Sequence, residues 1–326
     1  MKLLAPLLGI ALLGLAGQSI AKPSVKEIVS SVVGVQAEIP ANARTAHSLG
    51  TRRQGSGVII DSNGLILTIG YLILEAVKIQ VSEGDEQQIP AVFVGYDSES
   101  GFGVLRALKP LKGKAVEMGV SKALKRENPV LIVSDGRGGG LKSAMVISRR
   151  SFAGYWEYLL ESAIFTTPPI QNFAGAALID TNLKLVGIGS LFVGDAEAKG
   201  VRLPGNMFVP IDRLYPVLAD LIALGRPSTP PKPWLGVYLS EVYGRVVVTR
   251  VAAASPASDQ GMGEGDFILK VGGLDVTDMA DFYRKLWKQG HAGVAVNLTI
   301  LRGSEVKSLT LKSDDRYRHY KNLPVK

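Results

Sequence analysis

The side chains that most often carry out catalysis are few in this sequence. The chain has three histidines, His47, His291 and His319, and no cysteine. Because cysteine is absent, thiol catalysis, disulfide bonds and Cys-based metal sites are excluded. The histidines lie far apart and no HExxH-type spacing occurs, so we expect no metal site. Serine nucleophiles remain open, and these need a histidine base and a carboxylate that orients it.

A glycine-rich segment at residues 136–140, Gly-Arg-Gly-Gly-Gly, has the composition of a phosphate-binding loop. Such a loop ends in Gly-Lys-Ser or Gly-Lys-Thr and runs into a helix. This segment has neither feature, so we interpret it as a surface loop. No cofactor is expected.

Short apolar runs separated by turn residues predict a protein made mainly of β-strands. Residues 55–60 and 65–68 are joined through Asn63-Gly64, which predicts a hairpin. Strands spaced in this way without intervening helices indicate an antiparallel barrel or sandwich. Further strands are expected at residues 77–82, 91–95, 103–107, 129–134, 144–148, 159–166, 176–180, 185–189 and 207–209.

A helix and a linker end this first region. Asp212 is a suitable N-cap, residues 214–224 are apolar at helical spacing, and Gly225 is a typical helix end. Residues 226–233 contain four prolines and predict a semi-rigid linker. The residues beyond it suit one small domain with a helix at 279–289 that begins after Asp278. Its strands are expected at residues 236–240, 246–251, 266–271, 294–301 and 307–311.

The first 21 residues have the features of a signal peptide. A positive start, Met1-Lys2, precedes an apolar stretch at residues 3–15, and Ser19-Ile20-Ala21 is a small-x-small cleavage site. An uncleaved anchor is the alternative, but the apolar stretch is short for a membrane span and no later run is longer. We expect cleavage after Ala21, a location in the periplasm or outside the cell, and no integral membrane protein.

Composition and charge restrict the partners. The chain of 326 residues is 46% hydrophobic and 20% charged, which is typical of globular domains. Its net charge of +8 would indicate nucleic acid in a cytoplasmic protein. Export favours anionic envelope surfaces or acidic proteins instead, so no nucleic-acid partner is expected. The basic residues are scattered except at 316–321, within a tail at 314–326 that we expect to be solvated.

Four motifs in order resemble those of HtrA/Deg-type serine proteases. The hairpin at 55–68 resembles the start of the protease domain, and residues 207–211 resemble its last strand. Trp234-Leu235-Gly236-Val237 resembles the first PDZ strand, and residues 263–273 resemble the PDZ motif in which Gly-Asp precedes a strand and a turn. Nearly all of residues 55–312 are covered.

This resemblance implies a mainly β fold. A chymotrypsin-like double antiparallel β-barrel is expected at residues 55–225, after an N-terminal segment at 22–54. The linker at 226–233 then leads to a small α+β PDZ domain at 234–313. The family activity would be serine endopeptidase.

The catalytic triad that the resemblance implies is vacant in this sequence. The family's histidine follows a Leu-Thr-Asn-x pattern, where this chain reads Leu-Thr-Ile-Gly and then Tyr71. Gly101 stands at the aspartate position, and Ala174 stands at the serine of the Gly-Asn-Ser-Gly-Gly turn. Tyrosine is a poor base at neutral pH because its reference pKa is about 10. We therefore expect an inactive serine-protease homologue with no catalytic residues.

The PDZ resemblance implies a site for peptides. Such domains add a ligand as an extra strand and hold its C-terminal carboxylate in main-chain N–H groups. The helix residues also fit a second interpretation, in which they are the buried face of that helix together with Tyr283 and Trp287. The residues expected to form the peptide site are Leu235, Gly236, Val237, Leu239, Phe282 and Leu286.

Three functions are compatible with these features. The leading hypothesis is an exported pseudoprotease that binds C-terminal or unfolded peptide segments of envelope proteins, as an adaptor, a chaperone or a regulator of an active protease relative. The second is an active endopeptidase that uses unconventional residues such as Ser134 or Ser190. The third is a structural subunit of an envelope assembly. The resemblance implies trimerisation through N-terminal aromatics, but residues 22–70 contain none, so no homotrimer is expected.

Overall fold

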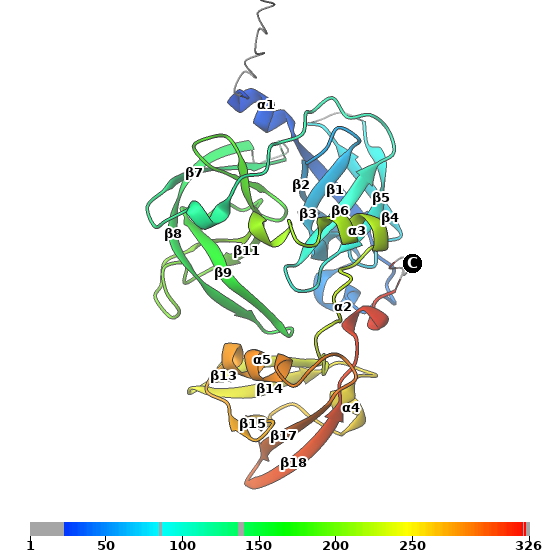
Figure 1. Cartoon of the computed structure of the whole chain (residues 1–326), viewed down its shortest axis with the longest axis vertical. Coiled ribbons are helices and arrows are strands. Elements are labelled where there is room, and N and C mark those ends of the chain that lie inside the picture. The colour runs from blue at the N-terminus through cyan, green and yellow to red at the C-terminus, as the bar shows by residue number, and fades with distance from the viewer. Residues whose placement is uncertain (1–22, 85–86, 136–139, 322, 324–326) are drawn as a thin grey trace, which may run out of the picture.

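The computed structural model describes residues 23–84, 87–135, 140–321 and 323 (Figure 1). The predicted signal peptide and most of the glycine-rich loop lie outside these residues. Two β-barrels stand side by side, and a smaller domain follows below them (Figure 1). The expected mainly β fold, a double antiparallel barrel followed by a small α+β domain, is confirmed. No helix in the described part is long and apolar enough to span a membrane.

The first barrel closes through a strand that the predicted domain boundary left out. β1 pairs with β2 on one side and with β4 on the other, so the barrel begins before residue 55. A short helix, α1 (Val25–Ser30), precedes it and is capped by Ser24. In spatial order the strands are β1 (Val32–Glu38), β2 (Arg52–Ile59), β3 (Leu65–Ile69), β6 (Phe102–Ala107), β5 (Ile89–Tyr96) and β4 (Lys78–Ser82).

The predicted hairpin joins β2 to β3. Asp61 accepts hydrogen bonds from the main-chain N–H groups of Asn63 and Leu65, at 2.8 and 2.7 Å. Gly64 has a φ of 75°, which glycine adopts without strain. The turn therefore forms from its local sequence. Two short helices also belong to this barrel, α2 (Ala46–Leu49) and η1 (Gly70–Leu72).

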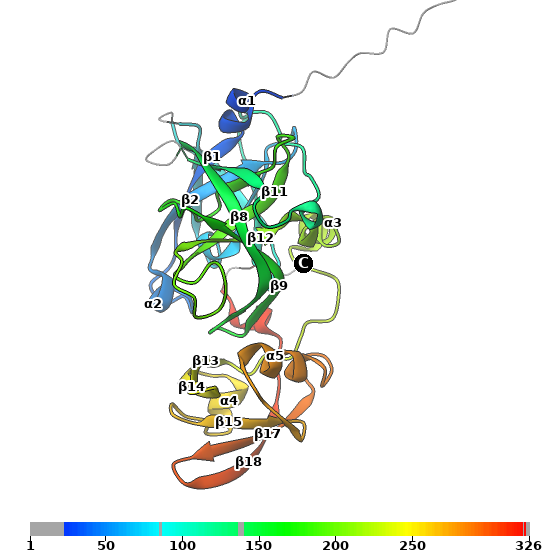
Figure 2. The ribbon, with the colours of Figure 1, turned by 90° about the vertical axis from the view of Figure 1, so that its left-hand side faces the viewer.

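The second barrel has two long strands, β8 and β9. Their hairpin extends beyond the barrel toward the small domain (Figure 2). The sequence analysis predicted only the middle of β8, because its ends lack a continuous apolar pattern. The short helix η2 (Ser121–Ala123) precedes the barrel. In spatial order its strands are β7 (Pro129–Ser134), β8 (Gly140–Gly154), β9 (Tyr158–Thr167), β12 (Gly205–Pro210), β11 (Leu185–Val193) and β10 (Ala177–Ile179).

The helix that ends the barrels is shorter than expected. After η3 (Ile211–Arg213), the α-helix α3 spans only Leu218–Leu224. Pro216 lacks a main-chain N–H and disfavours helical geometry in the residue before it, so the helix begins later. Asp212 is not the N-cap, because its carboxylate accepts a hydrogen bond from the Ser121 hydroxyl. Gly225 ends the helix in the left-handed conformation, as predicted.

The small domain combines one sheet with two helices, α4 (Pro256–Asp259) and α5 (Met279–Trp287). Asp278 caps α5, as predicted, by accepting a hydrogen bond from the Asp281 N–H at 2.8 Å. The short β16 (Leu274–Asp275) pairs with β15. In spatial order the strands are β13 (Val237–Val242), β14 (Arg245–Val251), β15 (Phe267–Val271), β17 (Ala295–Arg302) and β18 (Glu305–Lys312).

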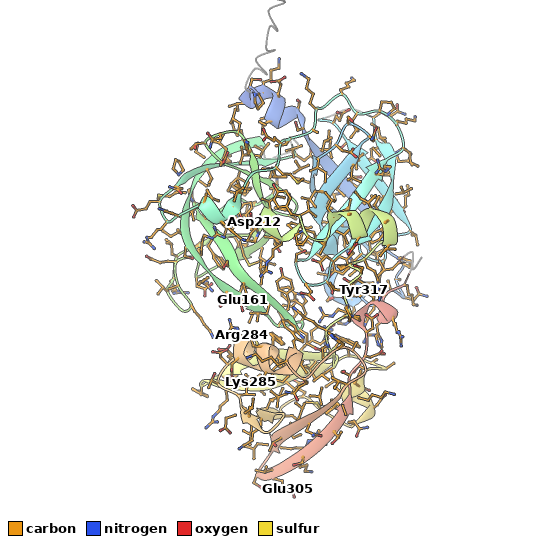
Figure 3. All side chains as sticks on the ribbon, in the orientation of Figure 1. Glu161, Asp212, Arg284, Lys285, Glu305 and Tyr317 are labelled. Carbon is orange, nitrogen blue, oxygen red and sulfur yellow. The ribbon has the colours of Figure 1, made fainter. Side chains whose placement is uncertain are left out.

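The basic tail is not a solvated extension. It returns to the barrels through η4 (Arg316–His319), and Tyr317 lies beside the first barrel (Figure 3). The side chain of Tyr317 is buried, and its hydroxyl accepts a hydrogen bond from the Ser98 N–H at 2.9 Å. The aromatic residues of this segment supply the apolar surface through which it packs against the barrel. The prediction of a solvated tail considered only the basic residues.

Candidate functional site

The positions that the resemblance assigns to the triad lie around one cavity. Tyr71 and Gly101 line a cavity of about 300 Å³ between the barrels, the tail and the small domain. Ala174 follows Phe173, which lines the same cavity. Most of the wall is apolar, with aromatic side chains that include Trp156 and Trp234.

Tyr71 is held as a hydrogen-bond donor. Its hydroxyl donates to the carbonyl of Ser190 at 2.8 Å, and the Arg53 guanidinium fixes its main-chain carbonyl at 2.6 Å. Burial raises the pKa of the Tyr71 phenol far above its ordinary value. The phenol therefore stays protonated at neutral pH and does not act as a base.

Gly101 and Ala174 occupy tight turns. Gly101 has a φ of 83°, so a side chain here would strain the backbone. The nearby Asp97 is buried, and its carboxylate closes the same turn by accepting from the Ser100 hydroxyl at 2.6 Å. The carbonyl of Ala174 accepts from the Ser56 N–H at 2.8 Å, and its methyl group offers no nucleophile.

One histidine reaches this cavity from the tail. His319 contacts the Arg44 guanidinium through Nδ1 at 3.3 Å and Asp314 through Nε2 at 2.8 Å. A guanidinium only donates, so Nδ1 accepts and Nε2 carries the proton that it gives to Asp314. Both ring nitrogens are engaged, which leaves neither for a substrate proton. His47 and His291 are exposed elsewhere.

Within the described residues, no group of three or more His, Cys, Asp or Glu side chains is placed to hold a metal ion. The cavity chemistry is therefore that of aromatic and aliphatic walls with Arg44 and His319 at one side.

A second site lies at the start of β13, where main-chain N–H groups surround a carboxylate. Gly236 and Val237 donate to Oε1 of Glu157 at 2.6 and 2.9 Å, and Leu235 donates to Oε2 at 3.0 Å. Glu157 lies at the tip of the β8–β9 hairpin of the second barrel. The loop thus binds a carboxylate, and the carboxylate belongs to the chain itself.

The hairpin main chain also pairs with β13. The Leu239 N–H donates to the carbonyl of Tyr155 at 2.8 Å, two residues before Glu157. From α5, the Tyr283 hydroxyl accepts from the Glu157 N–H at 3.2 Å and donates to the Gly154 carbonyl at 2.8 Å. The hairpin tip therefore lies between β13 and α5.

Two further side chains complete this contact. Leu159 of β9 is only 9% exposed and belongs to the buried apolar cluster of the small domain. The Arg316 guanidinium donates to the carbonyls of Trp156 and Glu157 at 2.6 and 2.8 Å. Burial raises the pKa of the Glu157 carboxyl above its ordinary range, and Arg316 and the three N–H donors oppose that rise.

The structure places the predicted peptide-site residues in two roles. The main chain of Leu235, Gly236 and Val237 contacts the carboxylate, whereas the side chains of Leu239, Phe282 and Leu286 are fully buried in the domain core. Burial of Phe282 and Leu286 fits both the buried-face and the groove interpretation, because Leu159 of the hairpin belongs to the same cluster. The sequence did not predict Glu157 as a ligand or the contacts of Tyr283 and Arg316 with the hairpin, because these contacts join segments that are far apart in the chain and carry no local pattern.

Comparisons with known proteins identify both domain types. Residues 55–188 match the trypsin-like peptidase domain family, and residues 233–312 match the PDZ domain family. The serine protease Do-like HtrA of Bacillus subtilis is 24% identical over 292 residues, which cover 80% of this chain and 64% of that protein. The periplasmic pH-dependent serine endoprotease DegQ of Escherichia coli is 25% identical over 260 residues, covering 77% of this chain and 57% of DegQ. This chain thus spans less than two thirds of either relative.

Solved structures show the same fold. The HtrA-type protease AlgW, in complex with a decapeptide, aligns over 90% of this chain and 97% of its own, with a TM-score of 0.54 and 22% identity. The serine endoprotease from Yersinia pestis aligns over 89% of this chain and 96% of its own, with a TM-score of 0.54 and 21% identity.

Proposed function

We propose that this chain, which has the trypsin-like peptidase domain and single PDZ domain of an HtrA/Deg-type serine protease, binds peptides without cutting them. It would act in the cell envelope as an exported adaptor, chaperone or regulator of an active relative. The periplasmic location named for DegQ supports the compartment. The observation that carries the proposal is the convergence of three main-chain N–H groups on a carboxylate, beside a barrel whose expected catalytic positions hold Tyr71, Gly101 and Ala174.

The geometry of the barrel cavity supports the absence of hydrolysis. Acyl transfer by this fold needs a nucleophile, a base that accepts its proton and a carboxylate that orients the base. Ala174 has no hydroxyl, the Tyr71 phenol donates to Ser190, and both nitrogens of His319 are engaged. Loss of such a group of residues lowers turnover about a million-fold in other enzymes.

Hydrolysis is tested with the mature protein, residues 22–326, on labelled casein. We expect no cleavage above that of the buffer. Cleavage by wild-type protein that disappears in a Ser190→Ala variant purified in parallel would overturn the proposal. Cleavage that is equal in both preparations and persists through repeated purification would also overturn the proposal, because Ser134 or another group would then act in place of Ser190.

The binding half is tested with peptides that differ only at their C-terminus. The N–H groups bind the charged C-terminal carboxylate, and a peptide that ends in an amide lacks this charge. We therefore expect the peptide with a free C-terminal carboxylate to bind and the amidated peptide not to bind. Equal binding of both forms would place the peptide elsewhere and contradict the proposal.

A second candidate function is an endopeptidase that uses Ser190. The observation in its favour is that Ser190 lines the cavity next to Tyr71. A fluorophosphonate probe that labels Ser190 would support this function, and absence of labelling would exclude it.

A further inference from the structure

The three main-chain N–H groups at the start of β13 already hold a carboxylate in this structure. We propose that the β8–β9 hairpin tip, residues 154–159, is an internal ligand of the PDZ groove, and that a free C-terminal peptide binds by displacing it and opening the contact between the domains. This inference rests on the proposed function and describes how peptide binding by the PDZ domain would be regulated. The external ligand is an extended peptide with a free carboxylate and an apolar side chain near its end.

The hairpin supplies each feature of a ligand that such a groove accepts. Its carboxylate, on Glu157, receives three N–H bonds from residues 235–237. Its main chain pairs with the receiving strand through the Tyr155 carbonyl and the Leu239 N–H. Its apolar side chain, Leu159, enters the buried cluster of the domain. A side-chain carboxylate thus stands in for a terminal one, because a hairpin has no chain end to offer.

External and internal ligands exclude each other. The N–H groups of Gly236 and Val237 both point at Oε1 of Glu157, so a second carboxylate finds no donors while the hairpin is in place. The Leu239 N–H is likewise used. Each donor makes one hydrogen bond well, so binding is competitive.

The internal ligand is suited to displacement. Glu157 has a φ of 53°, which costs free energy in a residue other than glycine, and its carboxylate is buried. A free peptide does not carry this backbone strain, although its carboxylate is buried in the same way. The apparent affinity for the peptide equals the intrinsic affinity multiplied by the fraction of molecules that are open. Removing the Glu157 charge therefore raises the apparent affinity.

Opening would also expose other surface. Leu159 leaves the PDZ cluster, and the Tyr283 hydroxyl loses its contacts to Gly154 and Glu157. The aromatic cavity next to Trp156 and Tyr155 then becomes accessible. Peptide binding at one domain is thereby linked to exposure of an apolar surface on the other.

The test compares wild-type mature protein with Glu157→Gln, which keeps the shape of the side chain and removes its charge. Glu161→Gln is the matched control, because Glu161 lies in β9 of the same hairpin and pairs with Arg284 at the exposed edge. The probe is the strongest binder selected on Glu157→Gln from displayed heptapeptides with free C-termini. We expect Glu157→Gln to bind it roughly tenfold tighter than wild type, and Glu161→Gln to bind it like wild type.

A second readout needs no peptide. The chain has no cysteine, so two introduced cysteines accept one spin label each. Lys122→Cys lies in η2 before the second barrel, and Glu305→Cys lies at the far end of the small domain, where Figure 3 labels Glu305. We expect a narrow distance distribution in the wild-type background. In the Glu157→Gln background, and in wild type with saturating probe peptide, the distribution should broaden and shift to longer distances.

The outcomes separate the two proposals. Equal peptide affinity in wild type and Glu157→Gln would overturn the internal ligand and leave peptide binding intact. An unchanged label distance in Glu157→Gln would likewise overturn it. If no peptide binds any variant while Glu157→Gln opens, the proposed peptide function fails and the intramolecular docking stands.

Discussion

The barrel cavity lacks the side chains that catalysis by its fold requires, whereas the PDZ loop keeps the main-chain groups that bind a carboxylate. In the cavity, function would depend on the identities of three side chains, and these positions hold Tyr71, Gly101 and Ala174. In the loop, function depends on main-chain N–H groups at residues 235–237, which bind a carboxylate in this structure. Three substitutions can abolish the first kind of site. The second kind survives sequence change as long as the backbone keeps its shape.

This difference predicts which residue matters most in each region. The loop should be sensitive to Gly236, because a backbone site is lost when its conformation is lost. Restoring one catalytic side chain in the cavity should not produce proteolysis, because the other two members of the triad are still missing. The following predictions test this contrast from the largest expected effect to the smallest.

Gly236→Ala should destabilise the small domain by about 3 kcal/mol. Gly236 has a φ of 84°, and a Cβ there would lie 2.3 Å from the Cβ of Ser255. Urea unfolding of the mature protein measures the loss. Gly244→Ala is the control, because Gly244 also has a positive φ but has nothing within 4 Å of its Cβ, and it should cost about 1 kcal/mol. Equal costs would contradict a close-packed loop.

Arg316→Ala should weaken the contact between the tail and the β8–β9 hairpin by about 2 kcal/mol, because two carbonyls of the hairpin lose a charged donor. Arg318→Ala is the control. Arg318 is exposed and its nearest carboxylate oxygen is 3.8 Å away, so little change is expected. Hydrogen exchange of the hairpin amides reports the effect, and identical exchange in both variants would show that the tail does not hold the hairpin.

Tyr283→Phe should cost about 1.5 kcal/mol. The variant removes the hydroxyl that accepts from the Glu157 N–H and donates to the Gly154 carbonyl, which leaves both groups without this partner in a buried place. Tyr243→Phe, at a fully exposed tyrosine, controls for the loss of a hydroxyl. Thermal unfolding compares the two, and a control as destabilised as Tyr283→Phe would refute the argument.

Arg284→Gln should cost less than about 0.5 kcal/mol, and the cost should vanish in 1 M salt, where the screening length falls to about 3 Å. Arg284 faces Glu161 across the domain boundary, and both side chains are 44% exposed (Figure 3). The measurement is urea unfolding at low and high salt. A salt-independent loss of several times this size would mean that the exposed edge, rather than the hairpin tip, holds the domains together.

Ala174→Ser should leave proteolysis undetectable. The introduced hydroxyl would lack a base, since the Tyr71 phenol is already committed to the Ser190 carbonyl. Labelling by a fluorophosphonate probe is the measurement, with Ala177→Ser of the barrel interior as the control. Rapid labelling of the Ala174→Ser variant, but not of Ala177→Ser, would contradict the prediction, because it would require a base that activates the introduced hydroxyl.

Local signals predicted much of the fold. The Asn63-Gly64 turn, the Asp278 cap and the Gly225 helix end act within a few residues, and all three form in the structure. The helix α3 begins later than the apolar pattern predicts because Pro216 disfavours helical geometry just before it. The prediction of a solvated tail was wrong because Tyr317 finds its partner Ser98 in the turn between β5 and β6, far away in the sequence.

The candidate sites show the same limit. The residues of the loop could be named from sequence, because the Trp-Leu-Gly-Val segment carries a recognisable pattern. The residue that occupies the loop could not be named from sequence. Glu157 lies 78 residues before Leu235, and in the sequence it resembles any surface glutamate of a hairpin. Only the three-dimensional packing of the two domains brings them together.

The most direct test observes the N–H groups of Leu235, Gly236 and Val237 by NMR in the mature protein. A charged acceptor shifts such amide protons downfield, so we expect downfield signals in wild type and their loss in Glu157→Gln. Adding a selected peptide with a free carboxylate should restore them, and the amidated peptide should not. Signals that are the same in all four samples would contradict the central claim that this loop is the carboxylate site of the protein.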